Sequence, residues 1–239
     1  MKKEVEIREY KCGKIKGKRD FVVNESIITL VINNYKTIRI SISPSLYREF
    51  VYGYLFTSNI ISAKGDIDDI IIGNKKIEVN LLQFIDNEVM LKGTSGGYFP
   101  DSEEKDCVLK RKIIPDFDCL IPLFDKFSDK SKVFMKTGGT HSAALSDGNE
   151  INYFAEDIGR HNAIDKVVGM ALLDENNFSK LYLLTSGRIS SEIVRKAFYS
   201  KIAVIISHSA PTSLAIKKAK DYNIILIGFL RDNRFNIYT

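Results

Sequence analysis

The sequence has no tryptophan, and its 239 residues include only three histidines and three cysteines. The cysteines, Cys12, Cys107 and Cys119, are too few and odd in number for a disulfide framework. No two of them have Cys-x-x-Cys spacing, and no histidine lies at zinc-site spacing from a cysteine. A structural metal site is therefore not expected.

Long hydrophobic runs are also missing. No stretch is apolar over enough residues to span a bilayer. Met1 to Tyr10 alternates charged and apolar residues and has no apolar core of the kind found in secretory signals. We therefore expect a cytoplasmic protein without a membrane partner.

The common nucleotide-binding fingerprints are absent too. The sequence contains neither G-x-x-x-x-G-K-[ST] nor G-x-G-x-x-G after a predicted strand, so an ordinary kinase, NTPase or dehydrogenase is not indicated. The net charge of +5, from 35 basic and 30 acidic residues, suits an anionic ligand but does not indicate nucleic-acid binding. Lys11 to Arg19 is strongly basic without interleaved aromatics, which predicts a solvated arm.

The first part of the chain, residues 1–115, is predicted to be a β-rich α+β unit. Two hairpins are expected, one turning at Asn33-Asn34 and one at Gly73-Asn74. A helix is expected to begin at Pro44. The predicted strands are Ile27–Ile32, Thr37–Ile42, Ile70–Ile72, Ile77–Leu82 and Glu88–Leu91, and Gly93 to Asp106 is predicted to be a loop.

The second part, residues 116–239, is predicted to be an α/β domain because strand and helix patterns alternate. Strands are expected at Val133–Lys136, Ile151–Ala155, Leu181–Thr185, Ala203–Ser207 and Ile224–Phe229. Helices are expected at Leu120–Phe127, His141–Leu145, Ala163–Leu173, Ser190–Tyr199 and Thr212–Asp221. The boundary between the parts is placed near Pro115.

Glycine, arginine and histidine collect in the loops that follow these strands. Open α/β sheets bind ligands outside the carboxyl ends of their strands. Gly138-Gly139 and Ser186-Gly187 would let backbone N–H groups approach an anion, and Arg160, Arg188, Arg231 and Arg234 could surround a pyrophosphate. All three histidines, His141, His161 and His208, lie in these loops.

Each motif alone also suits a purely structural role. Gly138-Gly139 fits a simple turn, and Arg160 could pair with Asp157 or Asp165. Arg231 and Arg234 could be solvated. The agreement of several loops in polarity, charge and strand end favours a site for a phosphate-bearing ligand.

Taken together, the loops resemble the formate dehydrogenase accessory sulfurtransferase family (FdhD-type proteins). The matching stretches are 136–144, 156–166 with its Glu-Asp-Ile-Gly-Arg-His-Asn run, 186–192, 209–215, 227–231 and 236–239. The resemblance covers roughly residues 20 to 239.

The resemblance implies a cytidine-deaminase-like fold for the C-terminal α/β layer domain and a homodimer. It also implies sulfur transfer from a cysteine desulfurase to the bis-molybdopterin guanine dinucleotide cofactor, before that cofactor enters the formate dehydrogenase catalytic subunit. GDP-like nucleotides are expected to mimic the cofactor. The residues expected to bind it are Thr137, Gly138, Gly139, His141, Arg160, His161, Ser186, Gly187, Arg188, Ser209, Pro211, Thr212, Phe229, Leu230, Arg231, Asp232, Asn233 and Arg234.

Deaminase chemistry itself is not expected. It needs H-x-E and P-C-x-x-C, whereas Ala143 stands where the glutamate would be and no cysteine pair follows a proline.

The cysteine pair on which the family's sulfur chemistry depends is missing. The resemblance places its two positions on Gly97 and near Pro100. Cys107, flanked by Asp106 and slightly later by Lys110, Arg111 and Lys112, is either a relocated persulfide carrier or an unreactive thiol. Two functions therefore remain open: a sulfurtransferase with a substituted cysteine, and a non-catalytic chaperone for the molybdenum cofactor.

Overall fold

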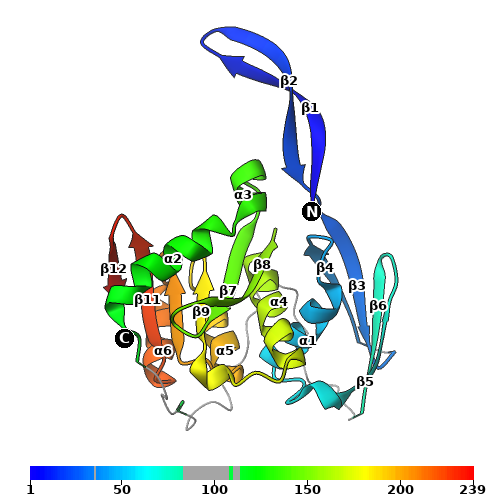
Figure 1. Cartoon of the computed structure of the whole chain (residues 1–239). Helices are drawn as coiled ribbons and strands as arrows, with labels where there is room; N and C mark the ends of the chain where they lie inside the picture. Colours follow the sequence, from blue (N-terminus) through cyan, green and yellow to red (C-terminus); the bar gives the residue numbers. More distant parts are fainter. Residues whose placement is uncertain (35, 83–107, 110–113) are drawn as a thin grey trace.

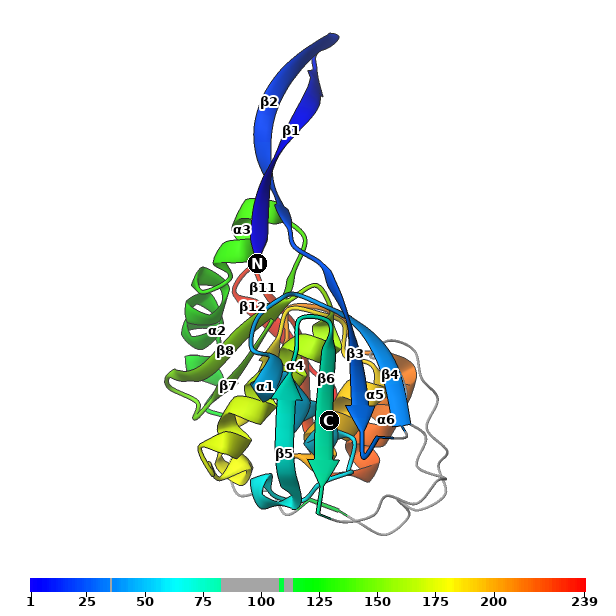
Figure 2. The same cartoon turned by 90° about the vertical axis from the view of Figure 1, so that its right-hand side faces the viewer.

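The computed structural model describes residues 1–34, 36–82, 108–109 and 114–239, which form three sheets and the helices around them. The first sheet is a hairpin of β1 (Lys2–Lys11) and β2 (Lys14–Val23), which pair antiparallel along their whole length. It projects from the body as an arm (Figures 1 and 2), and we call residues 1–23 the arm. Cys12 and Gly13 turn the chain with positive φ, and most arm side chains are exposed, as expected for a solvated segment.

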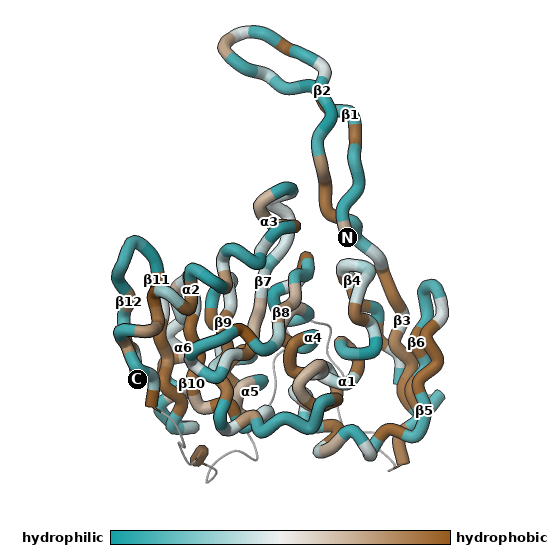
Figure 3. The backbone as a smooth tube through the Cα atoms, viewed as in Figure 1, coloured by the Kyte–Doolittle hydropathy of each residue, from teal (hydrophilic) through white to brown (hydrophobic). Residues whose placement is uncertain are grey.

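The second sheet has the order β4-β3-β6-β5 and contains both predicted hairpins. Its strands are β3 (Ser26–Ile32), β4 (Lys36–Ile42), β5 (Ile67–Ile72) and β6 (Lys76–Leu81). Asn33 and Asn34 have φ of 49° and 62°, which confirms the tight turn predicted for them. The alternation along β3 buries Ile28, Leu30 and Ile32 on one face. Figure 3 shows these apolar strands in the body, beside a mostly hydrophilic arm.

Helix α1 (Tyr47–Thr57) lies between this sheet and α4 (Arg160–Leu173) (Figure 1). The two helices approach so closely that only glycine fits at the crossing. A Cβ on Gly53 would lie 1.7 Å from the carbonyl oxygen of Asp165, and one on Gly169 would lie 1.7 Å from that of Glu49. One apolar core consequently runs through both parts of the chain, from Leu30 through Phe50 to Val167.

The third sheet has six strands in the order β12-β11-β10-β9-β7-β8. They are β7 (His141–Ser146), β8 (Ile151–Asp157), β9 (Tyr182–Thr185), β10 (Val204–Ser207), β11 (Ile225–Arg231) and β12 (Arg234–Ile237). Strands β9, β10 and β11 are parallel, whereas β7 runs antiparallel to β8 and β9, and β12 antiparallel to β11.

Helices cover both faces of this sheet. Helices α4, α5 (Ser191–Tyr199) and α6 (Ser213–Asp221) share a core with one face, and α2 (Leu120–Asp129) with the other. Three short 3-10 helices, η1 (Lys64–Asp66), η2 (Phe117–Cys119) and η3 (Phe178–Lys180), lie in the connections. The mixed α/β architecture agrees with the predicted class. In the described ranges, no helix is long and apolar enough to cross a membrane.

Two predicted elements are wrong. The segment expected as strand Val133–Lys136 is helix α3 (Lys132–Thr137), and the segment expected as helix His141–Leu145 is strand β7. Tertiary contacts override local propensity in both, because β7 is buried between β8 and β9 and the Glu156 carboxylate accepts hydrogen bonds from the first turn of α3. Gly138 therefore ends a helix, with φ 63°, and does not lead into one.

The other predicted elements that fall on described residues are confirmed, with bounds shifted by a few residues. The expected strand Glu88–Leu91 and the expected loop 93–106 lie outside the described residues. The domain boundary near Pro115 stays a prediction.

Candidate functional site

The topology of the six-stranded sheet brings the predicted loops to one edge. Because β9, β10 and β11 are parallel, their carboxyl ends lie together, and antiparallel β7 places its first residue, His141, at the same edge. The Ser186 N–H donates to the carbonyl oxygen of Ser142 at 3.0 Å, and the Ser142 N–H donates to Ser186 Oγ at 2.9 Å. The start of β7 and the end of β9 are thus joined directly.

Gly187 stands at the centre of this edge. A Cβ placed on it would lie 3.1 Å from the Cβ and Cδ of Arg160 and 3.5 Å from Nδ1 of His141. A side chain at this position would require Arg160 to shift by a few tenths of an ångström, so glycine suits the close packing of Arg160 and His141 against this loop. Serine hydroxyls fix the loop backbone, because Ser207 Oγ donates to the carbonyl oxygen of Gly187 at 2.7 Å and Ser209 Oγ donates to that of Ser186 at 2.9 Å.

The two histidines at this edge are held neutral. Burial lowers the pKa of His141, and the Arg160 charge lowers it further against an opposing effect of Asp157. Burial, followed by the charges of Lys196 and Arg160, lowers the pKa of His161 to about 3. His161 Nε2 lies 3.4 Å from a Glu192 carboxylate oxygen without forming a hydrogen bond.

Arg160 supplies the positive charge of the buried part of the site. Its Nε is buried and has no hydrogen-bond partner in the described part of the chain. The sequence left open whether Asp157 or Asp165 pairs with Arg160. In the structure Asp157 forms an ion pair with Lys166 and Asp165 with Lys196, both at 2.6 Å. A buried guanidinium donor without a partner suits an anionic oxygen from a ligand.

The acids next to Arg160 have structural roles. Glu156 accepts hydrogen bonds from the N–H groups of Val133 and Phe134 at 2.9 and 2.7 Å and from the hydroxyl of Thr140 at 3.0 Å. Glu156 thereby satisfies backbone N–H groups of the first turn of α3, which have no hydrogen-bond partner within the helix. Both carboxylate oxygens of Glu156 therefore accept hydrogen bonds from the chain itself.

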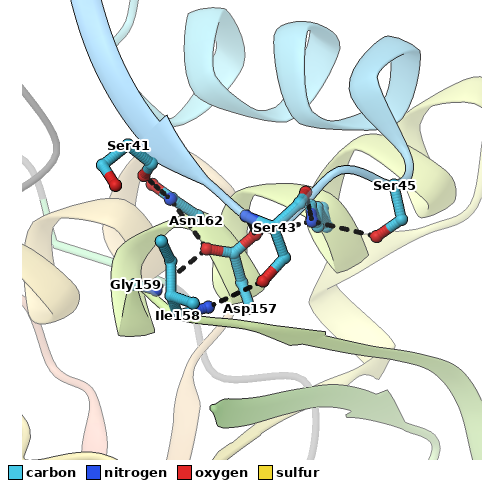
Figure 4. Close-up of polar contacts among 8 residues, drawn as sticks. Ser41, Ser43, Ser45, Asp157, Ile158, Gly159 and Asn162 are labelled. Carbon is cyan, nitrogen blue, oxygen red and sulfur yellow. Dashed lines mark hydrogen bonds and ion pairs between the residues drawn. The ribbon is translucent and has the colours of Figure 1, made fainter. Parts of the chain in front are cut away.

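Asp157 is fully buried and joins the two parts of the chain (Figure 4). It accepts hydrogen bonds from the N–H groups of Ser43 and Gly159 at 3.0 and 2.8 Å, and from the side chains of Lys166 and Asn162 at 2.6 and 2.8 Å. The Ile158 N–H in turn donates to Ser43 Oγ at 3.1 Å. This network fixes the start of α4, and hence Arg160, to the segment that precedes α1.

The Phe229–Arg234 segment forms the outer end of the site. Phe229 has φ 55°, a strained conformation for a bulky residue, where the β11–β12 register shifts. Its N–H donates to the carbonyl oxygen of Ser209 at 3.3 Å, and the Arg231 guanidinium lies 5.6 Å from the centroid of its ring. Arg231, Asp232, Asn233 and Arg234 are exposed, whereas the Leu230 side chain packs in the core.

The remaining predicted residues are more dispersed. Thr137 closes α3 by donating to the carbonyl oxygen of Val133, and a Cβ on Gly139 would lie 2.8 Å from Val23 Cγ1 of the arm. Thr212 caps α6, Pro211 packs beside Gly228, and Arg188 is exposed. The structure therefore brings His141, Arg160, Gly187 and the Ser186 and Ser209 loops together, and leaves Thr137–Gly139 beside the arm.

Two residues that hold the site in place were not predicted from the sequence: Ser207, which fixes the Gly187 loop, and Lys166, which binds Asp157 and Ser43. A serine at the end of a buried strand was the available signal for Ser207, whereas the role of Lys166 depends on Ser43, 123 residues away. Cys107 lies outside the described residues. Among the residues described, no cluster of three or more His, Cys, Asp or Glu could hold a metal ion.

Comparison with known proteins shows the family of the chain. The family model described as FdhD/NarQ matches residues 23–239. The chain belongs to the FdhD/NarQ family. The match starts at the last residue of the arm. It therefore includes the four-stranded sheet, the six-stranded sheet and every loop of the candidate site.

Individual relatives of this FdhD/NarQ member are similar over their full length. The "Sulfur carrier protein FdhD" of Listeria innocua is 32% identical, covering 98% of this chain and 95% of its own. The "Protein FdhD" of Methanocaldococcus jannaschii is 36% identical, covering 100% and 97%. A crystal structure from Desulfotalea psychrophila, assigned as a formate dehydrogenase accessory protein, superposes with a TM-score of 0.81 at 22% identity over 100% of this chain and 96% of its own. That likeness shows the shared fold.

Proposed function

We propose that this protein is a sulfur carrier and formate dehydrogenase accessory protein that binds the bis-molybdopterin guanine dinucleotide cofactor at the edge around Gly187. The single observation that carries the binding site is the buried, unpartnered Nε of Arg160, packed against a glycine in a loop fixed by serine hydroxyls. Such an arrangement favours a phosphate oxygen. Family membership and the relatives' name of sulfur carrier support the rest.

Arg160 and the loop at Gly187 would hold the phosphates, with Arg188, Arg231 and Arg234 contributing exposed positive charge. When bound, the cofactor would supply the metal centre that receives sulfur. The neutral His141 beside Arg160 would offer a hydrogen bond without adding charge.

Nucleotide titration tests the binding site. Replacing Arg160, Arg188 or Arg231 with Ala should in each case cost about 1.5–3 kcal/mol of GDP affinity, the usual contribution of a charged hydrogen bond. Lys64→Ala is the matched control, because Lys64 bonds the carbonyl oxygen of Leu173 at the opposite end of α4. Unchanged affinity in Arg160→Ala would refute the site.

The sulfur-transfer step rests on family membership, and its test is mass spectrometry after incubation with a cysteine desulfurase and cysteine. A persulfide on Cys107 that disappears in Cys107→Ser supports transfer by a relocated thiol. Cys12 and Cys119, the free cysteines among the described residues, serve as internal controls.

A second candidate is a chaperone that holds the cofactor without transferring sulfur. The observation that favours it is the sequence Gly93-Thr94-Ser95-Gly96-Gly97-Tyr98-Phe99-Pro100, which lacks the cysteines expected there. A protein that stays free of persulfide but binds GDP supports this alternative.

We also propose a cytoplasmic homodimer, with a cysteine desulfurase and the formate dehydrogenase catalytic subunit as partners. A cytidine-deaminase-like layering of the C-terminal part belongs to the same proposal. Its support is the mixed six-stranded sheet, with α2 packed on one face and α4, α5 and α6 on the other.

A further inference from the structure

The backbone of His208 is fixed at the carboxyl edge of the six-stranded sheet. His208 directly follows β10, and its N–H donates to the carbonyl oxygen of Thr185, the last residue of β9, at 3.3 Å. The preceding Ser207 is bonded to Gly187, and the N–H of the following Ser209 donates to Ser207 Oγ at 3.0 Å. The position of the His208 Cα therefore depends on the same contacts that fix the Gly187 loop.

The imidazole ring of His208 is supported on one side. It stacks on Phe124 of α2, with centroids 6.1 Å apart and planes 17° from parallel. Phe124 is 3% exposed and packs against Phe127 with centroids 5.0 Å apart, so it offers a rigid base. His208 itself is exposed, and its side chain makes no hydrogen bond within the described ranges.

His208 also lies between the two ends of the candidate site. The neighbouring Ser209 donates its hydroxyl to the carbonyl oxygen of Ser186 on one side and accepts the Phe229 N–H on the other. On the Ser186 side lie Gly187 and the unpartnered Arg160, and on the other side lies the Phe229 ring with Arg231 beside it. The backbone of His208 thus lies at the edge where the phosphate is proposed to bind, and its exposed ring lies on the α2 side of that edge.

We propose that His208 is a stacking residue for a planar heteroaromatic ring, a guanine or a pterin, that is attached to the phosphate bound at Arg160 and Gly187. The inference rests on the proposed function and adds the group that recognises the ring. A histidine whose only role was packing on Phe124 would influence stability alone, whereas a stacking residue discriminates between a nucleotide and its bare phosphate.

The test is calorimetric titration of the full chain with GDP, with inorganic pyrophosphate and with 6-hydroxymethylpterin. His208→Ala should weaken binding of the ring-bearing ligands roughly 5- to 150-fold, the usual effect of losing one base-stacking side chain, and leave pyrophosphate binding within about twofold. His208→Phe keeps a ring on Phe124 and should stay within about threefold of wild type for GDP. Loss of GDP affinity alone assigns the ring as guanine, and loss of pterin affinity alone assigns it as pterin.

Thermal unfolding separates stacking from folding. A melting temperature of His208→Ala close to that of wild type, together with the selective loss, supports the proposal. Equal losses for GDP and pyrophosphate, or unchanged GDP and pterin binding in His208→Ala, overturn it while the proposed phosphate site stands. A wild-type protein that binds neither GDP nor pyrophosphate overturns both.

Discussion

Replacing Asp157 with Asn should strongly destabilise the protein, because four donors converge on this buried carboxylate. Its two oxygens accept from Ser43 and Lys166 on one side and from Gly159 and Asn162 on the other. Asparagine keeps a single oxygen, so its amide nitrogen must face a pair of donors. Burial lowers the pKa of Lys166 and the Asp157 charge opposes that shift, so the substitution also leaves a fully buried ammonium without its counter-charge.

Breaking a buried pair from one side costs about 3–5 kcal/mol of the free energy of unfolding. The urea midpoint should fall by roughly 1–2 M with an unchanged slope. The chain has no tryptophan, so far-UV circular dichroism is the suitable probe. Glu150→Gln is the matched control, because its 2.5 Å pair with Lys126 is exposed and should contribute less than about 1 kcal/mol.

A double variant checks the physical cause. If the penalty comes from the uncompensated ammonium, then adding Lys166→Met to Asp157→Asn should cost clearly less than the sum of the two single changes. A loss below about 1 kcal/mol in Asp157→Asn, or strict additivity in the double variant, would refute the reasoning.

Two further predictions concern packing and pH. Gly53→Ala should lower the free energy of unfolding by about 1–3 kcal/mol or more, because α1 must move away from α4 to admit a methyl group, and Gly65→Ala, with open space at its Cβ, is the control in urea unfolding. The pKa of His161 is about 3 when folded and 6.5 in its ordinary state, so the unfolded chain binds more protons below pH 6.5, and stability falls as the pH drops toward 3. Between pH 7 and pH 5 this group should account for about 2 kcal/mol of lost stability, and His161→Gln should remove that part of the pH dependence. Equal pH slopes in wild type and variant would contradict the assignment.

Local patterns predicted much of the fold. The Asn33-Asn34 turn was predictable because asparagine tolerates positive φ between two β-branched runs. The strands β9, β10 and β11 were predictable because continuous apolar runs end in serine or glycine loops, and their parallel pairing placed those loops at one edge.

The failures have a common cause, which is that distant partners decide the local structure. The predicted strand Val133–Lys136 is a helix because Glu156 accepts hydrogen bonds from its first turn. The predicted helix His141–Leu145 is a strand because it pairs with two neighbouring strands. The ion-pair partners of the buried acids could not be predicted from the sequence either. Asp157 finds Lys166, nine residues away, only because Ser43 completes the cluster from another part of the chain.

The arm gives the molecule an uneven distribution of charge. Residues 1–23 contain eight basic and four acidic residues, a net +4 out of the +5 of the whole chain, at the end that projects furthest from the body. The rest of the chain thus carries a net charge of only +1, so most of the excess positive charge is concentrated in the arm. An acidic surface approaching from a distance would attract the arm before it contacts the body, and the rate of such an encounter would fall steeply as salt shortens the screening length to about 8 Å at physiological ionic strength.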